Sequence, residues 1–141
     1  MPVITDSDNS DDDSTPPSSE NVFKILITTD NHLGFCERDE ERGRDSLISF
    51  EECLQIAREE NVDFILLGGD LFHENKPSNH VMLECVNLLR KYCLGDKPIE
   101  FKLVSDEKIN FSSQVKENPF PWANFKDPNI NIGIPVFSIH G

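Results

Sequence analysis

The segment Val62–His73, VDFILLGGDLFH, joins an apolar run to two glycines, an aspartate and a histidine. Its run Asp63–Leu67 is short and continuous, which is typical of a strand buried on both faces of a parallel sheet. Glycines directly after such a strand allow a backbone or a ligand to approach closely. The segment therefore predicts an α/β fold with polar side chains at the carboxyl end of a central strand.

A second run of the same design lies earlier in the chain. Alternating apolar residues over 23–28 predict a strand, and Thr29-Asp30-Asn31-His32 follows it directly. Residues i and i+2 of an extended segment point the same way, so Asp30 and His32 can bind one cation together. Asp70, leaving the adjacent parallel strand, can reach the same point and bridge to a second ion. Oxygen and imidazole ligands suit a hard or borderline divalent metal.

Each of these motifs also has a simpler interpretation. A single Asp-x-His arises by chance in many proteins, and aspartates at strand ends often cap the following turn. His73 is either an acid or base that faces a phosphate or a residue that holds its loop. We expect His80 to be solvated and His140 to pack beside the sheet edge. The order and spacing of the two motifs together favour the metal site.

Two helices and three further strands are expected from the remaining pattern. The helices are predicted over about 45–60 and over 77–92, where Pro77-Ser78 opens the second. The further strands are predicted over 99–103, 130–134 and 136–139. A long loop, 105–129, carries an aromatic patch of Phe120, Trp122 and Phe125. This order predicts a layered α/β sheet with a hairpin-like excursion before the last strand.

Both predicted helices carry apolar stripes. The first has one, made of Leu47, Phe50, Leu54 and Ala57. Asp45 or Ser46 can cap its start. The second has two, made of Val81, Cys85, Leu88 and Tyr92 and of Met82, Val86, Leu89 and Cys93. One stripe is enough to dock a helix on a sheet, so the other is covered by further chain, by a partner, or by burial deep in one domain.

Charge and composition limit the function classes. The chain has 26 acidic and 13 basic residues, which argues against strong binding of nucleic acid by this chain alone unless metal ions supply positive charge. Residues 1–21 are acidic and rich in Ser, Thr and Pro, so we expect a disordered tail. No apolar run has transmembrane length, no signal peptide is evident, and the four cysteines form no C-x-x-C pair. We expect a reduced, intracellular protein without a membrane partner.

The two motifs resemble a known family. Asp-x-His followed by Gly-Gly-Asp is similar to the opening of the calcineurin-like metallophosphoesterase superfamily, whose fold is a layered β-sheet sandwich with flanking helices. Within it, four blocks strongly resemble the meiotic recombination eleven family of double-strand-break repair nucleases: residues 23–34, 62–78, 88–98 and 134–141. The resemblance runs from about residue 22 to the end and is weakest over 105–126.

That resemblance implies roles for the motif residues. Asp30 and His32 would hold one manganese ion, Asp70 would bridge two, and His73 would contribute to nuclease activity. The family's third block continues from His140-Gly141 into Asn-His-Asp, which supplies a further metal ligand and the catalytic histidine. We therefore expect residues 22–141 to be the N-terminal part of the phosphoesterase domain, and this chain alone to be inactive.

The resemblance also implies partners. Family members form homodimers through helices, which places the second stripe, Met82, Val86 and Leu89, at an interface. Candidates for contacts with DNA phosphates are Arg42, Arg44 and Lys76, although exposed and solvated side chains are the simpler interpretation. For the complete protein we expect DNA ends, a coiled-coil SMC-like ATPase and a nibrin-type subunit as partners, and the nucleus as location.

The sequence favours a manganese-dependent DNA nuclease of double-strand-break repair, acting as 3′–5′ exonuclease and endonuclease. Two alternatives stay open. One is a different phosphoesterase on the same scaffold, such as a protein or nucleotide phosphatase. The other is a non-catalytic product that retains only dimerisation. An assay that compares hydrolysis of DNA with hydrolysis of phosphoprotein and small phosphate esters distinguishes a nuclease from the first alternative. A dimerisation test addresses the second.

Overall fold

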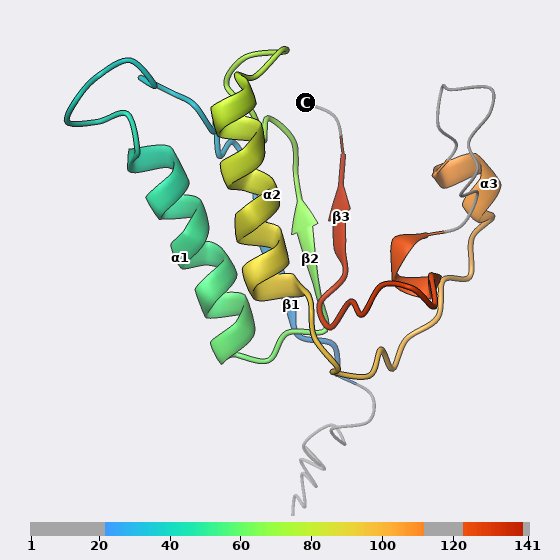
Figure 1. Cartoon of the computed structure of the whole chain (residues 1–141). Coiled ribbons are helices and arrows are strands. Elements are labelled where there is room, and N and C mark those ends of the chain that lie inside the picture. Colours follow the sequence, from blue (N-terminus) through green and yellow to red (C-terminus); the bar gives the residue numbers. More distant parts are fainter. Residues whose placement is uncertain (1–21, 112–122, 140–141) are drawn as a thin grey trace, which may run out of the picture.

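A computed structural model describes residues 22–111 and 123–139 of the chain. Three strands form one parallel sheet in the order β1 (Ile25–Thr28), β2 (Phe64–Leu67) and β3 (Val136–Ser138). Two long helices, α1 (Asp45–Glu59) and α2 (Asn79–Cys93), connect the strands and lie on one face of the sheet (Figure 1). The predicted α/β class is confirmed. The predicted acidic tail, Phe120, Trp122 and His140 lie outside the described residues.

The register of the sheet brings the ends of β1 and β2 to the same level. Asp63 fixes this register at the start of the pair, because its side chain accepts a hydrogen bond from the Lys24 amide and its own amide donates to the Lys24 carbonyl. Pairing then runs to Thr28 opposite Leu67 at the carboxyl end. Both polar motifs therefore leave the sheet side by side.

The predicted apolar stripes form the core between the helices and the sheet. All four residues of the α1 stripe are buried, together with Ile65 and Leu67 of β2. From α2 the buried residues are Val81, Cys85, Leu88 and Cys93. Burial raises the pKa of the Cys85 and Cys93 thiols to about 11, so both are neutral at physiological pH and pack as small hydrophobic side chains.

The two helices begin differently. The predicted start of α2 is confirmed, because the Ser78 hydroxyl accepts a hydrogen bond from the Val81 amide at 3.2 Å. The predicted cap of α1 is wrong. Arg44 occupies the position before that helix without a side-chain cap, and the Ser46 hydroxyl accepts a hydrogen bond from the Gly34 amide instead. Ser46 therefore ties the loop after β1 to α1.

The predicted strands over 99–103 and 130–134 are wrong. The alternation correctly indicates burial, since Ile99, Phe101 and Leu103 are half-buried while their neighbours are exposed. However, Phe101 packs its ring against other aromatic side chains, and its backbone forms no ladder with a neighbouring strand. Ile132 makes only an isolated antiparallel bridge with Leu94. The long predicted loop contains a short helix and a 3-10 turn, α3 (Glu107–Asn110) and η2 (Asn124–Lys126).

The two faces of the sheet are covered differently. The helices cover β2 on one face, so Ile65 and Leu67 are buried, whereas Phe64 and Leu66 on the other face are half-buried. The face opposite the helices carries an aromatic cluster with ring centroids 5.2–6.4 Å apart: Phe23, Phe64, Phe101, Phe125 and Phe137. Within the described ranges, no second sheet of the expected sandwich is present.

None of the helices in the described part of the chain is both long and apolar enough to cross a bilayer.

Candidate metal centre

The two loops that follow β1 and β2 are held together by their backbones. The amides of Asp30 and His32 donate hydrogen bonds to the carbonyls of Gly69 and Asp70, at 3.1 and 3.0 Å. The backbone of Leu33 then makes the next contact between the same two loops. Glycine favours this close approach, because a Cβ on Gly68 would lie 3.0 Å from the Cβ of Thr29, which is tighter than ordinary van der Waals contact. The glycines of the second motif thus allow the first motif to lie against it.

The structure brings together Asp30, His32 and Asp70, the three side chains predicted as metal ligands. Each offers one ligand atom, and these atoms all lie within 4.8 Å of one another. Nε2 of His32 is 3.9 Å from a carboxylate oxygen of Asp30. Both aspartates are exposed and the histidine is half-buried, so the cluster opens to solvent. This is an arrangement that can accept a cation from solution.

The backbone that achieves this convergence differs from the one expected. Asp30, His32 and Asp70 have φ angles of 54°, 45° and 47°, which is the left-handed region rather than an extended strand. The predicted alternation of i and i+2 therefore does not explain why Asp30 and His32 meet. Each such residue costs on the order of 1 kcal/mol of backbone strain, and strain of this kind concentrates at functional sites.

The charges of the cluster favour a cation. In the described ranges, neither Asp30 nor Asp70 forms an ion pair with a lysine or arginine. The Thr29 hydroxyl donates to Asp30 at 2.8 Å and is a neutral partner. His32 faces Asp30 through Nε2, while its buried Nδ1 has no hydrogen-bond partner among the described residues. Two carboxylates and an imidazole without a counter-charge are a suitable donor set for a divalent metal.

His73 lies at the edge of this cluster. Its imidazole contacts the His32 ring at a centroid distance of 5.6 Å and the Phe35 ring at 5.1 Å. Its backbone amide donates to the Leu33 carbonyl at 3.0 Å, which fixes its loop against the first motif. The side chain is exposed, and it lines a cleft of about 630 Å³ between the two loops. His73 therefore adjoins the cluster through its contact with His32, and it also lines a cleft whose walls do not include Asp30, His32 or Asp70.

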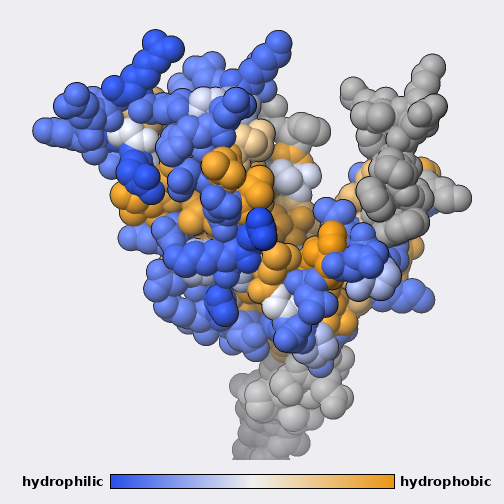
Figure 2. All heavy atoms as spheres, viewed as in Figure 1, coloured by the Kyte–Doolittle hydropathy of each residue, from blue (hydrophilic) through white to orange (hydrophobic). Residues whose placement is uncertain are grey.

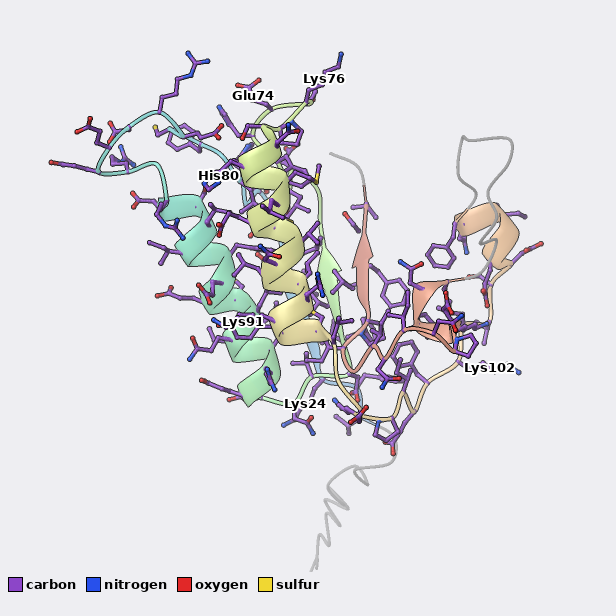
Figure 3. The ribbon with its side chains drawn as sticks, in the orientation of Figure 1. Lys24, Glu74, Lys76, His80, Lys91 and Lys102 are labelled. Atoms are coloured by element: carbon purple, nitrogen blue, oxygen red, sulfur yellow. The ribbon has the colours of Figure 1, made fainter. Side chains whose placement is uncertain are left out.

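The basic residues predicted to contact DNA occupy different surroundings. Lys76 extends from the loop after β2 (Figure 3) and lines the same cleft as His73. Arg42 and Arg44 instead pair with Asp45 and Glu84 at 3.5 and 3.8 Å, and neither lines the cleft. Such exposed pairs are weak, so both arginines can exchange partners. His80 is exposed in the first turn of α2, as expected.

Sequence reasoning missed two residues near His73. Arg38 lines the same cleft as His73 and Lys76, and the charged loop over 37–44 could have indicated a basic side chain here. Phe35 contacts His73, and an aromatic residue directly after the first motif and Gly34 was the available signal. The geometry adds a basic and an aromatic side chain to the predicted set.

The second stripe of α2 is divided in the structure. Met82 and Val86 are each 42% exposed, whereas Leu89 is half-buried and packs against the core. Leu83, at 58% exposure, adjoins the exposed part and was missed because it lies outside the stripe. The exposed apolar surface of α2 is therefore made of Met82, Leu83 and Val86.

A further cavity lies away from the metal cluster. A groove of about 660 Å³ separates α2 from β3 and is lined by Val86, Leu89, Val136 and Phe137, among others. Figure 2 shows apolar residues gathered between α2 and the part of the chain that carries α3 and η2. The groove lacks the acidic and imidazole ligands of the cluster, so its chemistry does not compete with the metal site.

The sequence profile described as calcineurin-like phosphoesterase matches residues 23–141. The chain therefore belongs to the calcineurin-like phosphoesterase family, which is metal-dependent. The Asp30, His32 and Asp70 cluster is a possible metal-binding group in keeping with that family.

The chain is also similar to curated proteins named double-strand break repair protein MRE11. It is 56% identical to the one from Rattus norvegicus over 126 residues, which is 89% of this chain and 17% of the relative. The relative from Homo sapiens is 57% identical over 122 residues, covering 86% and 17%. The relative from Arabidopsis thaliana is 51% identical over 120 residues, covering 85% and 16%. The chain thus spans only 16–17% of the length of these relatives.

Proposed function

We propose that this chain is the N-terminal part of a manganese-dependent DNA nuclease of double-strand-break repair, with 3′–5′ exonuclease and endonuclease activities. One observation carries the proposal. Two carboxylates and an imidazole meet within 4.8 Å at the ends of two parallel strands, in a chain 56% identical to a rat double-strand break repair protein. This combination supports phosphodiester chemistry on DNA.

Each residue of the site has a task in this proposal. Asp30 and His32 would hold one manganese ion, and Asp70 would be shared with a second. When bound, such ions lower the pKa of a water and place positive charge beside phosphate oxygens. His73 acts at the phosphate, since its ring adjoins His32 and faces the cleft. Lys76, Arg42 and Arg44 contact the DNA backbone and add positive charge that the acidic chain otherwise lacks.

The wider assembly follows from the same similarity. We infer a homodimer through Met82, Val86 and Leu89, a coiled-coil SMC-like ATPase and a nibrin-type subunit as partners, and a nuclear location. The exposure of Met82 and Val86 supports the dimer, because exposed apolar side chains on one helix are suited to a helix of a second copy. We also expect the 141-residue chain alone not to cleave DNA with manganese, because three described ligands are few for two ions.

Metal binding by the 141-residue chain tests the site directly. We expect isothermal titration calorimetry with manganese to detect binding, and Asp70→Asn to weaken it at least about tenfold, as the loss of a ligand-shell contact does elsewhere. Glu40→Gln removes the same charge from an exposed loop residue and should leave the affinity unchanged. Equal affinities for the parent and Asp70→Asn would remove Asp70 from the site.

The reaction is tested in a chimera in which residues 23–139 replace the matching segment of the rat relative. We expect manganese-dependent cleavage of DNA from 3′ ends and at internal positions, with Asp70→Asn and His73→Ala both strongly impaired. A phosphoprotein and a small phosphate ester in parallel reactions test the alternative phosphoesterase. Faster hydrolysis of either substrate than of DNA contradicts the nuclease, and cleavage by the isolated 141-residue chain contradicts its expected inactivity.

A further inference from the structure

We propose that Phe35 is a positioning residue, which holds the imidazole of His73 over the metal cluster through an edge-to-face ring contact. The inference rests on the proposed function, because it assigns Phe35 a purpose only if His73 acts at the substrate phosphate. Phe35 is 44% exposed and is not part of the buried core. Core packing therefore does not account for an aromatic side chain at this place.

The backbone directs Phe35 toward His73. Its amide donates to the His32 carbonyl at 2.9 Å, which closes a tight turn directly after the candidate ligands. Leu33, inside that turn, is 1% exposed and accepts the hydrogen bond from the His73 amide. The same few residues thus anchor the His73 backbone and place the Phe35 ring beside its side chain.

Within the described part of the chain, two ring contacts orient the His73 imidazole. Its centroid lies 5.1 Å from that of Phe35 with an interplanar angle of 85°, and 5.6 Å from that of His32 with an angle of 67°. The described residues offer its ring nitrogens no hydrogen-bond partner, so an exposed imidazole would otherwise rotate among its rotamers. Edge-to-face pairs of this kind change such an equilibrium by about 2- to 10-fold.

The test uses Phe35→Leu in the chimera described above. We expect kcat for DNA cleavage to fall by about 2- to 10-fold with little change in KM, because the ring contact orients His73 without binding substrate. Phe35→Tyr keeps the ring edge and should restore the parent kcat. Phe23→Leu is the matched control, since Phe23 is also an exposed phenylalanine with edge-to-face contacts, on the face opposite the helices.

A double-mutant cycle separates positioning from structure. In the His73→Ala background, Phe35→Leu should cause no further loss of kcat, because the residue that it positions is absent. An equal loss in both backgrounds overturns the inference, as does a rise in KM alone, which indicates that Phe35 stacks on the substrate instead. Full activity of His73→Ala by itself contradicts the proposed role of His73 and not only the role of Phe35.

The contact is also visible without catalysis. In the 141-residue chain, we expect nuclear Overhauser effects between the ring protons of Phe35 and His73, and a displaced His73 ring resonance in Phe35→Leu but not in Phe23→Leu. Absence of these effects in the parent chain overturns the proposal whatever the activity of the chimera. Retention of the effects with an inactive chimera leaves the ring contact in place and contradicts the nuclease assignment.

Discussion

At the scale of single residues, holding the three candidate metal ligands together lowers the stability of the fold. Asp30 and Asp70 present two negative charges within 4.8 Å, and both, like His32, have left-handed backbone angles. Two exposed charges at this distance repel by about 1 kcal/mol in water. Neither the strain nor the repulsion is needed for the fold, because the core lies between the helices and the sheet. A site that retains both is preorganised for a cation.

Asp70→Asn should therefore stabilise the metal-free chain while it weakens manganese binding. Asparagine tolerates the left-handed region as well as aspartate does, and it removes one of the two charges. We expect the free energy of unfolding in urea, with a chelator present, to rise by about 1 kcal/mol. Glu40→Gln, which changes the overall charge equally, should leave it unchanged. A loss of stability in Asp70→Asn contradicts this account of the cluster.

At the scale of elements, Ser78 joins two parts of the site. Its hydroxyl accepts from the Val81 amide at the start of α2 and donates to the Glu37 carboxylate in the loop after β1. Ser78→Ala removes both contacts, so we expect the free energy of unfolding to fall by about 1–2 kcal/mol in urea denaturation. Ser78→Thr keeps the hydroxyl and should retain most of the stability. Similar values for the alanine variant and the parent would mean that water replaces both contacts.

Local signals predicted the two helices and all three strands of the sheet, and the reasons are physical. The apolar stripe of α1 and the serine before α2 act within a few residues, so the pattern alone contains them. The strands expected over 99–103 and 130–134 failed because alternation reports which side chains face inward, while a strand also requires a neighbour. Phe101 packs against aromatic rings instead of pairing its backbone with a neighbouring strand.

The sequence predicted which residues form the candidate site better than it predicted their geometry. Two motifs after parallel strands were sufficient to place Asp30, His32 and Asp70 at one edge. The left-handed backbone and the Phe35 contact with His73 depend on hydrogen bonds between two loops distant in sequence, which no local pattern contains. Sequence reasoning predicted which side chains meet, while tertiary contacts set their orientation.

At the scale of the whole molecule, the exposed α2 surface is the proposed dimer interface. Met82, Leu83 and Val86 are exposed apolar residues on one helix, at 42%, 58% and 42% exposure. A carboxylate in the middle of an apolar helix contact is left without a partner, which is costly. We expect Met82→Asp to weaken self-association of the 141-residue chain at least about tenfold in sedimentation equilibrium.

Val104→Asp supplies the matched control for this measurement, because Val104 is 97% exposed and lies outside α2. It adds the same charge and should leave the association constant unchanged, which separates a local contact from general repulsion between acidic chains. Overall repulsion is a real competitor here, since the chain already has a formal net charge of −13. An equal loss in both variants therefore assigns the effect to charge, and an unchanged mass for Met82→Asp removes α2 from the proposed dimer interface.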